Sequence, residues 1–247
     1  MIKFFRKIRQ KLLSENKFSK YFLYAIGEII LVVIGILIAL QINNWNETRK
    51  VKSTLSDYTE SLIKDLKKDT IILNEQIRSA DLDNEILDNL IERLSHGSAN
   101  NDTLLIIARH ELPAIFMYYR PLNTNTMMAM QSNGTIEYFD EITYNLLTEL
   151  QTIQNINGTI IQKQIDNHIL QFQAFNSKYV LDQYETISGP LSDKSWNNVD
   201  YDDLYRTVES FITTRKRMNV AGNSGKKEIL EWTEKVINRL IQISDIK

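Results

Sequence analysis

This sequence of 247 residues predicts an all-α fold, with one N-terminal transmembrane helix followed by an extracytoplasmic bundle of long helices. Three observations predict it. Glycine and proline number only 8 and 3, whereas they make up roughly 12% of an average chain. The stretch 21–42 is apolar enough and long enough to cross a bilayer. Apolar residues further along recur mostly every three, four or seven positions, which is typical of amphipathic helices.

Residues 1–20 form a basic segment, with seven lysines and arginines against one glutamate. The whole chain has a net charge of −2, so the remainder is acidic. An acidic body argues against a nucleic-acid partner, because phosphate binding needs a concentrated basic surface. Apolar residues alternate with the cations at helical spacing, so we expect a cytoplasmic amphipathic segment on the membrane surface. An ordinary basic flank is the alternative. The expected membrane-binding residues are Lys3, Arg6, Lys7, Arg9 and Lys11.

Residues 21–45 are expected to form the transmembrane helix. The 22 residues at 21–42 would rise about 33 Å, enough for a hydrocarbon core of about 30 Å. A buried helix of a soluble protein fits poorly, because the uninterrupted run 29–40 adjoins the basic flank. A cleaved signal peptide fits poorly too, because the apolar region is too long and no small-x-small site follows it. The excess of cations before the span places the N-terminus in the cytoplasm and the body outside it.

One face of this span carries small and polar side chains. At 100° per residue, five positions fall on one stripe, and two of them form a small-xxx-small pair that lets another helix approach closely. An ionisable group at this depth faces protein or extends to the interface. We therefore expect the stripe to pack against another helix, from a second copy or from another membrane protein; an isolated span with an extended glutamate is the alternative. The stripe is Tyr21, Glu28, Gly35, Ala39 and Asn46.

The N-terminal region is similar to a known family. The block KYFLYAIGEIILVVIGILIALQINNWNE, residues 20–47, follows MIKFFRKIRQKLL, and a weaker similarity lies at RPLNTNTMMAMQSNGTIEY, residues 120–138. Together these resemble the N-terminus of a large family of uncharacterised membrane proteins from Bacteroidetes-type bacteria, defined as a domain of unknown function. The resemblance implies a single-pass protein of the bacterial envelope. With the orientation expected from the flanking charges, this places the span in the inner membrane, the N-terminus in the cytoplasm and the body in the periplasm. It implies no activity.

The body reads as a series of helices. A long membrane-proximal helix is expected over 46–95, and residues 96–247 form the remainder of the bundle domain. A break at 95–101 leads to a helix expected over 102–118, capped by Asn101 or Asp102. Further helices are expected over 124–132, 140–182, 200–219 and 224–245, with a loop over 186–199. We expect Gly222 and Gly225 to separate the last two helices, because glycine destabilises a helix interior.

A search for catalytic and metal sites finds no convincing motif. The chain has no cysteine, and its histidines do not form the H-E-x-x-H zinc pattern. Asp166 and His168 could offer two metal ligands, although a polar helix face is the simpler interpretation. The run 81–85 superficially resembles a calcium loop but lacks the required glycine at its sixth position. We therefore expect no enzymatic activity, no cofactor and no metal.

Methionine is concentrated in one short stretch. Four of the six methionines lie between residues 117 and 130. They fit a short core helix, an adaptable surface that binds a protein or peptide, or a Cu(I) site, since thioethers serve all three purposes. The candidate partner surface comprises Met117, Met127, Met128 and Met130.

Two classes of function remain after these exclusions. The first is a membrane-anchored interaction or scaffold protein of the bacterial envelope, which binds a protein partner or forms a homo-oligomer through its span. The second is an extracytoplasmic module that senses a ligand and acts through a partner membrane protein. The cytoplasmic segment of about 20 residues is too short for a signalling domain of its own, which favours the first class.

Overall fold

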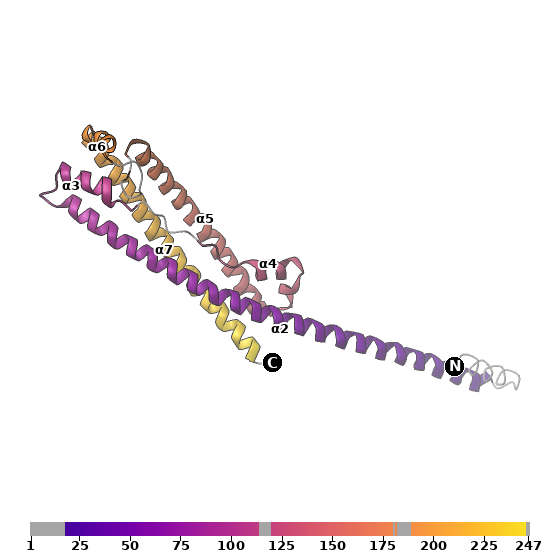
Figure 1. The fold of residues 1–247 in the computed structure, drawn as a ribbon. Coiled ribbons are helices and arrows are strands. Elements are labelled where there is room, and N and C mark those ends of the chain that lie inside the picture. The colour runs from indigo at the N-terminus through magenta and orange to yellow at the C-terminus, as the bar shows by residue number, and fades with distance from the viewer. Residues whose placement is uncertain (1–17, 114–119, 180, 182–188, 246–247) are drawn as a thin grey trace. The chain divides into compact units, whose positions relative to one another are not determined.

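The computed structural model describes residues 18–113, 120–179, 181 and 189–245 (Figure 1). Its regular elements are helical throughout the described residues, which confirms the all-α prediction. The chain divides into two compact units, Met1–Ser56 and Asp57–Lys247, which are treated separately. The basic membrane-surface set (Lys3, Arg6, Lys7, Arg9 and Lys11) and Met117 lie outside the described residues.

The first unit contains the N-terminal part of α2 (Phe18–Ser95). Within the described chain this helix is the one long and apolar enough to cross a membrane, and none of its apolar window is buried. Its large apolar side chains, from Phe22 to Ile42, are all exposed. Apolar surface on this scale is unfavourable in water at roughly 25 cal/mol per Å². The segment is therefore compatible with membrane anchoring.

The stripe expected to pack against another helix occupies the same part of α2. Gly35 and Ala39 are exposed, whereas Glu28 and Asn46 are half-buried. Tyr21 belongs to the helix by its backbone. A Cβ added at Gly35 would meet no atom within 4 Å, so the close-approach surface is open. Packing of a helix on this stripe stays a prediction.

The second unit is built on three long helices: the part of α2 after Ser56, α5 (Glu141–Lys178) and α7 (Tyr201–Asp245). Helices α5 and α7 pack along each other (Figure 1). The start of α7 contacts the end of α5, and the end of α7 contacts the start of α5, so the two are antiparallel. The contacts that establish this are Lys178 with Asp203, and Arg239 with Asp140.

Short elements connect α2 to α5. They are α3 (Asn101–Ile106), the π-helix η1 (Ile107–Glu111), α4 (Asn125–Ser132) and the 3-10 helix η2 (Thr135–Tyr138). The expected helix over 102–118 is thus shorter than predicted within the described residues. Its cap is Asn100, whose side chain accepts the Thr103 N–H, rather than Asn101 or Asp102. The helix therefore begins at Asn101, one residue earlier than expected.

The loop expected over 186–199 is wrong in its described part. A helix, α6 (Pro190–Asn197), begins directly after Gly189. Proline suits a first helical position, because it lacks only an N–H that would be unbonded there. Gly189 has a φ of 103°, which glycine adopts without strain. The side chain of Trp196 has 4% of its surface exposed, and its burial in the apolar core stabilises this helix.

The expected break between 219 and 224 is also wrong, because α7 runs unbroken past Gly222 and Gly225. Both glycines are buried. A Cβ built on Gly225 would lie 2.6 Å from Oδ1 of Asn157 on α5. The glycine therefore permits a close crossing of two helices, and tertiary packing outweighs its poor helix propensity.

The apolar core lies toward the end of the second unit that contains α3 and α6. It draws residues from every helix there, including Leu87 of α2, Ile107 of η1, Phe175 of α5 and Phe211 of α7, each with 0% of its surface exposed. Trp196 of α6 belongs to the same cluster. Short and long helices are thus joined in one hydrophobic cluster.

A buried polar layer joins α2 to α7. Arg215 donates from Nε and Nη2 to the two carboxylate oxygens of Asp83, at 2.8 and 2.9 Å. Asn219 donates to Asp83 at 2.6 Å. One turn further, Asn223 donates to Asp81 at 2.8 Å. Positions on α7 increase as their partners on α2 decrease, so α2 and α7 are antiparallel and their register is fixed by hydrogen bonds.

We predict that Gly225→Ala destabilises the second unit by about 1–3 kcal/mol, because the new methyl group overlaps the Asn157 side chain. Gly222→Ala is the matched control. Its Cβ would meet Lys226 Nζ at 3.8 Å, an ordinary contact. This variant should gain about 0.5–1 kcal/mol from helix propensity. Denaturant unfolding followed by circular dichroism measures both, and equal stability of the two variants would contradict the close crossing.

We also predict that Arg215→Met destabilises the protein by about 3–5 kcal/mol, since it leaves a buried carboxylate without its cation. Adding Asp83→Leu should recover a large part of this loss, because the unpaired charge is removed. A double-mutant cycle in urea measures the coupling between the two positions. Simple additivity of the two single changes would show that the pair is not coupled.

Candidate functional site

A groove of about 850 Å³ lies beside α5 in the second unit. Its volume is within the usual range for ligand pockets, roughly 300–1,000 Å³. Three parts of the chain line it: one turn of α2, the segment 121–124 with the first turns of α4, and one face of α5. The apolar part of the lining includes Leu62, Leu66, Met127, Met128, Leu147 and Leu150.

Carboxylates of α2 hold the segment 121–124 in place. Asn123 donates from its backbone N and from Nδ2 to Oδ1 of Asp69, at 2.9 and 2.6 Å. Thr126 Oγ1 donates to Oδ2 of Asp65 at 2.6 Å. Burial raises the pKa of Asp69, and the two hydrogen bonds from Asn123 oppose this effect. The groove wall opposite α5 is therefore fixed by side chains of α2.

The methionines of α4 divide between the core and the groove. Met130 is fully buried, with 0% of its surface exposed, whereas Met128 is 58% exposed and lines the groove. Met127 is half-buried and also lines it. Met130 therefore belongs to the core, whereas Met127 and Met128 lie at the groove, and binding of a partner by these two residues stays a prediction.

A pair of glutamines spans the groove from α4 to α5. Gln131 Nε2 donates to Oε1 of Gln151 at 2.7 Å, and Gln151 Nε2 donates back to Oε1 of Gln131 at 3.2 Å. The two carboxamides thus form a reciprocal pair with two hydrogen bonds. This is the pairing that a carboxamide makes with any group that offers one N–H and one C=O side by side.

The α5 face of the groove combines two rows of residues. One row is uncharged and polar, at intervals of four, four and three residues. The other begins with leucines and ends at Gly158. From residue 147 to residue 163 the face extends about 24 Å along the helix. The polar row is Gln151, Asn155, Thr159 and Gln162, and the other row is Leu147, Leu150, Gln154 and Gly158.

Charged side chains are scarce in the groove. Its lining contains one carboxylate, Asp65, and one ammonium, Lys163. Asp65 already accepts the Thr126 hydroxyl and lies 3.8 Å from Lys68 Nζ. The groove is therefore suited to an uncharged ligand with both apolar and hydrogen-bonding groups.

Sequence reasoning found the methionine side of this groove and missed the α5 side. The polar row was visible as uncharged residues at helical spacing in QTIQNINGTIIQ, residues 151–162. Such residues also occur on any solvated helix face. Only the position of α4 over this face distinguishes the row from an ordinary surface.

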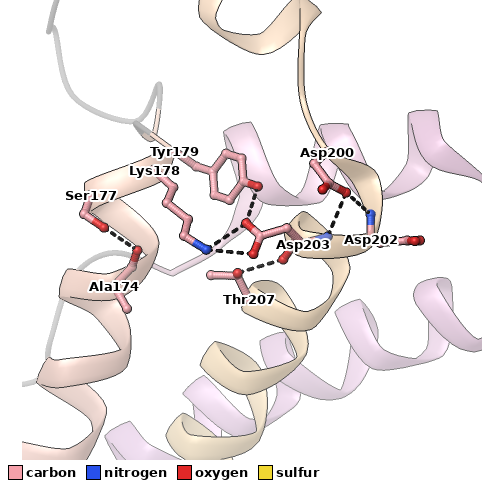
Figure 2. Close-up of polar contacts among 8 residues, drawn as sticks. All are labelled: Ala174, Ser177, Lys178, Tyr179, Asp200, Asp202, Asp203 and Thr207. Atoms are coloured by element: carbon pink, nitrogen blue, oxygen red, sulfur yellow. Dashed lines mark hydrogen bonds and ion pairs between the residues drawn. The ribbon is translucent and has the colours of Figure 1, made fainter.

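A second polar cluster lies where α5 ends and α7 begins (Figure 2). Asp203 accepts Lys178 Nζ at 2.7 and 2.9 Å and the Tyr179 hydroxyl at 2.7 Å. The hydrogen bond from Lys178, followed by that from Tyr179, lowers the pKa of Asp203. Burial, followed by the hydrogen bond to Asp203, raises the pKa of Tyr179.

The same cluster caps α7. Asp200 Oδ1 accepts the backbone N–H groups of Asp202 and Asp203, at 3.0 and 3.2 Å. The start expected for the helix over 200–219 is therefore confirmed to within one residue, and carboxylates at a helix start are favoured by its dipole. Because the groups bond to one another and to the helix, the cluster is structural.

His168 lies in the core and not on a polar helix face, so that interpretation is wrong. It has 0% of its surface exposed and packs edge-on against Phe211, with 4.9 Å between ring centroids. Its Nδ1 lies 3.3 Å from Thr214 Oγ1. Burial, followed by the positive charge of Arg215, lowers the pKa of His168 to about 4, and Asp83 opposes this effect. The side chain is therefore neutral in the folded protein above that pH.

The two weak metal motifs do not assemble into sites. Asp166 is exposed and accepts Gln162 Nε2 at 2.8 Å, whereas His168 is buried. In the run 81–85, Asp81 and Asp83 accept hydrogen bonds from α7. Among the described residues, no group of three or more His, Cys, Asp or Glu side chains could hold a metal ion.

Comparison with known families identifies one match. The model of a family of unknown function (DUF6090) matches residues 28–151, about half of the chain. The chain belongs to this family. The match begins within the apolar part of α2, includes α4, and ends at Gln151 of α5. In this DUF6090 member, the matched region therefore contains the α2 and α4 sides of the groove. No curated protein and no solved structure matched the chain.

We predict that acidification weakens the fold through His168. Its pKa is about 4 when folded, against 6.5 when exposed, so the unfolded state binds a proton first. The contribution of His168 to the free energy of unfolding is fully present above pH 6.5. It is lost as the pH drops toward 4, which lowers the free energy of unfolding by about 3 kcal/mol in total. Urea unfolding at several pH values should show this slope, and His168→Gln should remove its contribution.

The matched control is His96→Gln, which changes an exposed histidine. It should leave the pH dependence of the unfolding free energy unchanged. The same slope in wild type and His168→Gln would show that His168 is not the group responsible.

Proposed function

We propose that this DUF6090 member is a membrane-anchored binding protein whose helical unit holds a segment of a partner protein in the groove beside α5. The observation that carries the proposal is the groove itself. It combines exposed methionine with leucine and uncharged carboxamides. Apolar pockets with a few polar groups are the usual form of a binding site. Flexible thioethers adapt to the shape of a bound surface.

The N-terminal part of α2 supplies the anchor in this proposal. The large apolar side chains described in this part of the helix are exposed, and a basic flank precedes it in the sequence. We place the span in a bacterial inner membrane, with the N-terminus in the cytoplasm and the body in the periplasm, because the excess of lysine and arginine precedes the span. The cations Lys3, Arg6, Lys7, Arg9 and Lys11 would bind anionic headgroups.

A second contact is proposed within the membrane. Gly35 and Ala39 leave room for the backbone of another helix, and Glu28 and Asn46 lie on the same stripe. Small residues permit close packing, and polar groups form hydrogen bonds between helices. This face would hold a second copy of the chain or the span of the partner.

Ligand sensing through a partner membrane protein is the alternative function. The groove volume, about 850 Å³, also suits a small molecule. The length of the α5 face favours a protein segment, because a drug-sized molecule would contact only part of about 24 Å.

A photo-crosslinking residue placed at Met128 tests the proposal in cells that express the full chain. Met128 is 58% exposed in the groove, and Tyr205 on α7 is a control that is 48% exposed outside it. We expect one partner protein to be crosslinked from position 128 and not from position 205. Met127→Lys should reduce this adduct at least about tenfold, since it buries a charge in the contact.

Adducts of equal yield from positions 128 and 205, or no adduct from position 128, would refute binding in the groove. Identification of the crosslinked protein by mass spectrometry then gives the partner.

A further inference from the structure

We infer that the second unit binds a second copy of the same chain through the outer face of α5, with the two α5 helices antiparallel. This face carries a stripe of exposed residues, each seven positions after the previous one. The inference goes beyond the proposed function, because the stripe shares only Lys163 with the lining of the groove. The stripe is Ile142, Glu149, Ile156, Lys163 and Leu170.

The stripe is open to solvent. Its three apolar members, Ile142, Ile156 and Leu170, have 62%, 55% and 62% of their surface exposed. The residues that α5 gives to the core, such as Leu147 and Ile161, lie on another side of the helix. Exposed apolar residues that occur singly are normal on a protein surface. Here they recur at equal intervals on one face of one helix, so they form a row that another helix can cover.

The seven-residue interval is the one that suits contact between two long helices. Helices that wind around each other keep every seventh residue on their shared side. Even on a straight helix, the five positions drift by only about 80° around the axis. From residue 142 to residue 170 the stripe extends about 42 Å along α5. It therefore offers a second helix a long and continuous contact.

The stripe is symmetric in its chemistry about Ile156. Two aliphatic residues, Ile142 and Leu170, lie 14 positions to either side of it. Two opposite charges, Glu149 and Lys163, lie seven positions to either side. In an antiparallel pair with a two-fold axis at Ile156, the aliphatic ends meet each other. The carboxylate of one copy then meets the ammonium of the other, and this contact occurs twice because the axis repeats it.

A parallel pair would bring like charges together. Each residue of the stripe would face its own counterpart, so carboxylate would meet carboxylate and ammonium would meet ammonium. Juxtaposed like charges suppress an association, whereas exposed ion pairs add little affinity by themselves. The order of charges along α5 thus selects the antiparallel arrangement, and the aliphatic residues supply the buried surface.

The residues between the stripe positions obey the same symmetry. Asn145 and Asn167, both exposed, lie 11 positions to either side of Ile156, so two carboxamides can pair across the contact. Thr152 and Ile160, also exposed, lie four positions to either side and bring two β-branched side chains together.

Both charges of the stripe are available for this contact. Within the described residues, neither Glu149 nor Lys163 forms an ion pair. The remaining charged residue of α5 between residues 142 and 170 is Asp166, which accepts a hydrogen bond from Gln162 on its own helix. Another protein would need the reverse order of charges at matching intervals. A second copy supplies that order by symmetry.

Single cysteines test the arrangement in the full chain, which contains no cysteine of its own. The protein is placed in liposomes and treated with a short bifunctional thiol reagent. Ile156→Cys should crosslink to itself, because the position lies on the two-fold axis. Ile142→Cys should not, because its counterpart lies about 42 Å away, yet it should crosslink when mixed with Leu170→Cys. The control is Tyr144→Cys, which is 39% exposed on another side of α5.

Exchange of the two charges tests the basis of the pairing in the Ile156→Cys background. Glu149→Lys and Lys163→Glu should each lower the crosslinking yield at least about fivefold, because like charges then meet twice. The two changes together should restore the yield to within about twofold, since the charges are again complementary. Glu209→Lys, the same change at an exposed residue of α7, should have no effect. Circular dichroism should be unchanged in all of these variants, because the side chains are exposed.

Three results would each overturn the inference. They are equal yields from Ile156→Cys and Tyr144→Cys, self-crosslinking of Ile142→Cys, and a double charge exchange that does not restore the yield. Light scattering by the liposomes separates pairs within one membrane from pairs between two facing membranes, and either agrees with the antiparallel contact.

Discussion

The buried ion pair between Asp83 and Arg215 is the contact on which the second unit depends. Its two residues lie on different helices and are 132 positions apart in sequence, and both are almost fully buried. A buried carboxylate and guanidinium tolerate few arrangements, because each group must find its hydrogen-bond partners inside the protein. A shift of α7 by one turn along α2 would leave both charges without partners. The pair therefore selects one register where leucine packing would permit several.

The register set by this pair also positions the groove. With α7 fixed against α2, the crossing at Gly225 places α5, and α5 contributes the longest face of the groove. Asp69 and Asp65 then attach the segment 121–126 to α2, opposite that face. Thus carboxylates of α2 make both sets of contacts: Asp83 binds α7, and Asp69 and Asp65 bind the groove wall. The groove is thus positioned by polar contacts inside an otherwise apolar bundle.

Helical periodicity was enough to predict the fold class, the apolar span, the helix start at Asp200 and the approximate extents of α4 and α5. The same reasoning failed at Gly222, Gly225 and Pro190, where local propensity suggested breaks or a loop. At these positions tertiary contacts decide the outcome. Gly225 packs against Asn157, which is 68 residues away in sequence. The helix after Pro190 is stabilised by burial of Trp196, which the local sequence does not reveal. His168 lies seven residues from both Ile161 and Phe175, on the buried face of α5, and was assigned to a polar face because of its residue type. The groove was half predicted, through Met127 and Met128, because its α5 face depends on which helix lies opposite.

The segment that connects α3 to α5 forms one wall of the groove. Helices α2 and α5 run in the same direction, because both are antiparallel to α7, so the connection between them must travel back along the bundle. In a regular four-helix bundle a full helix would occupy that course. Here the described part of the return beyond residue 119 is a stretch without regular secondary structure at 120–124, a helix of 8 residues, α4, and the short 3-10 helix η2. Within the described residues, this course therefore covers α5 less completely than a full helix would, and the groove lies beside α4 and the segment 121–124 on that face of α5. A shortened course in a helical bundle is thus one way to form a groove without opening the apolar core.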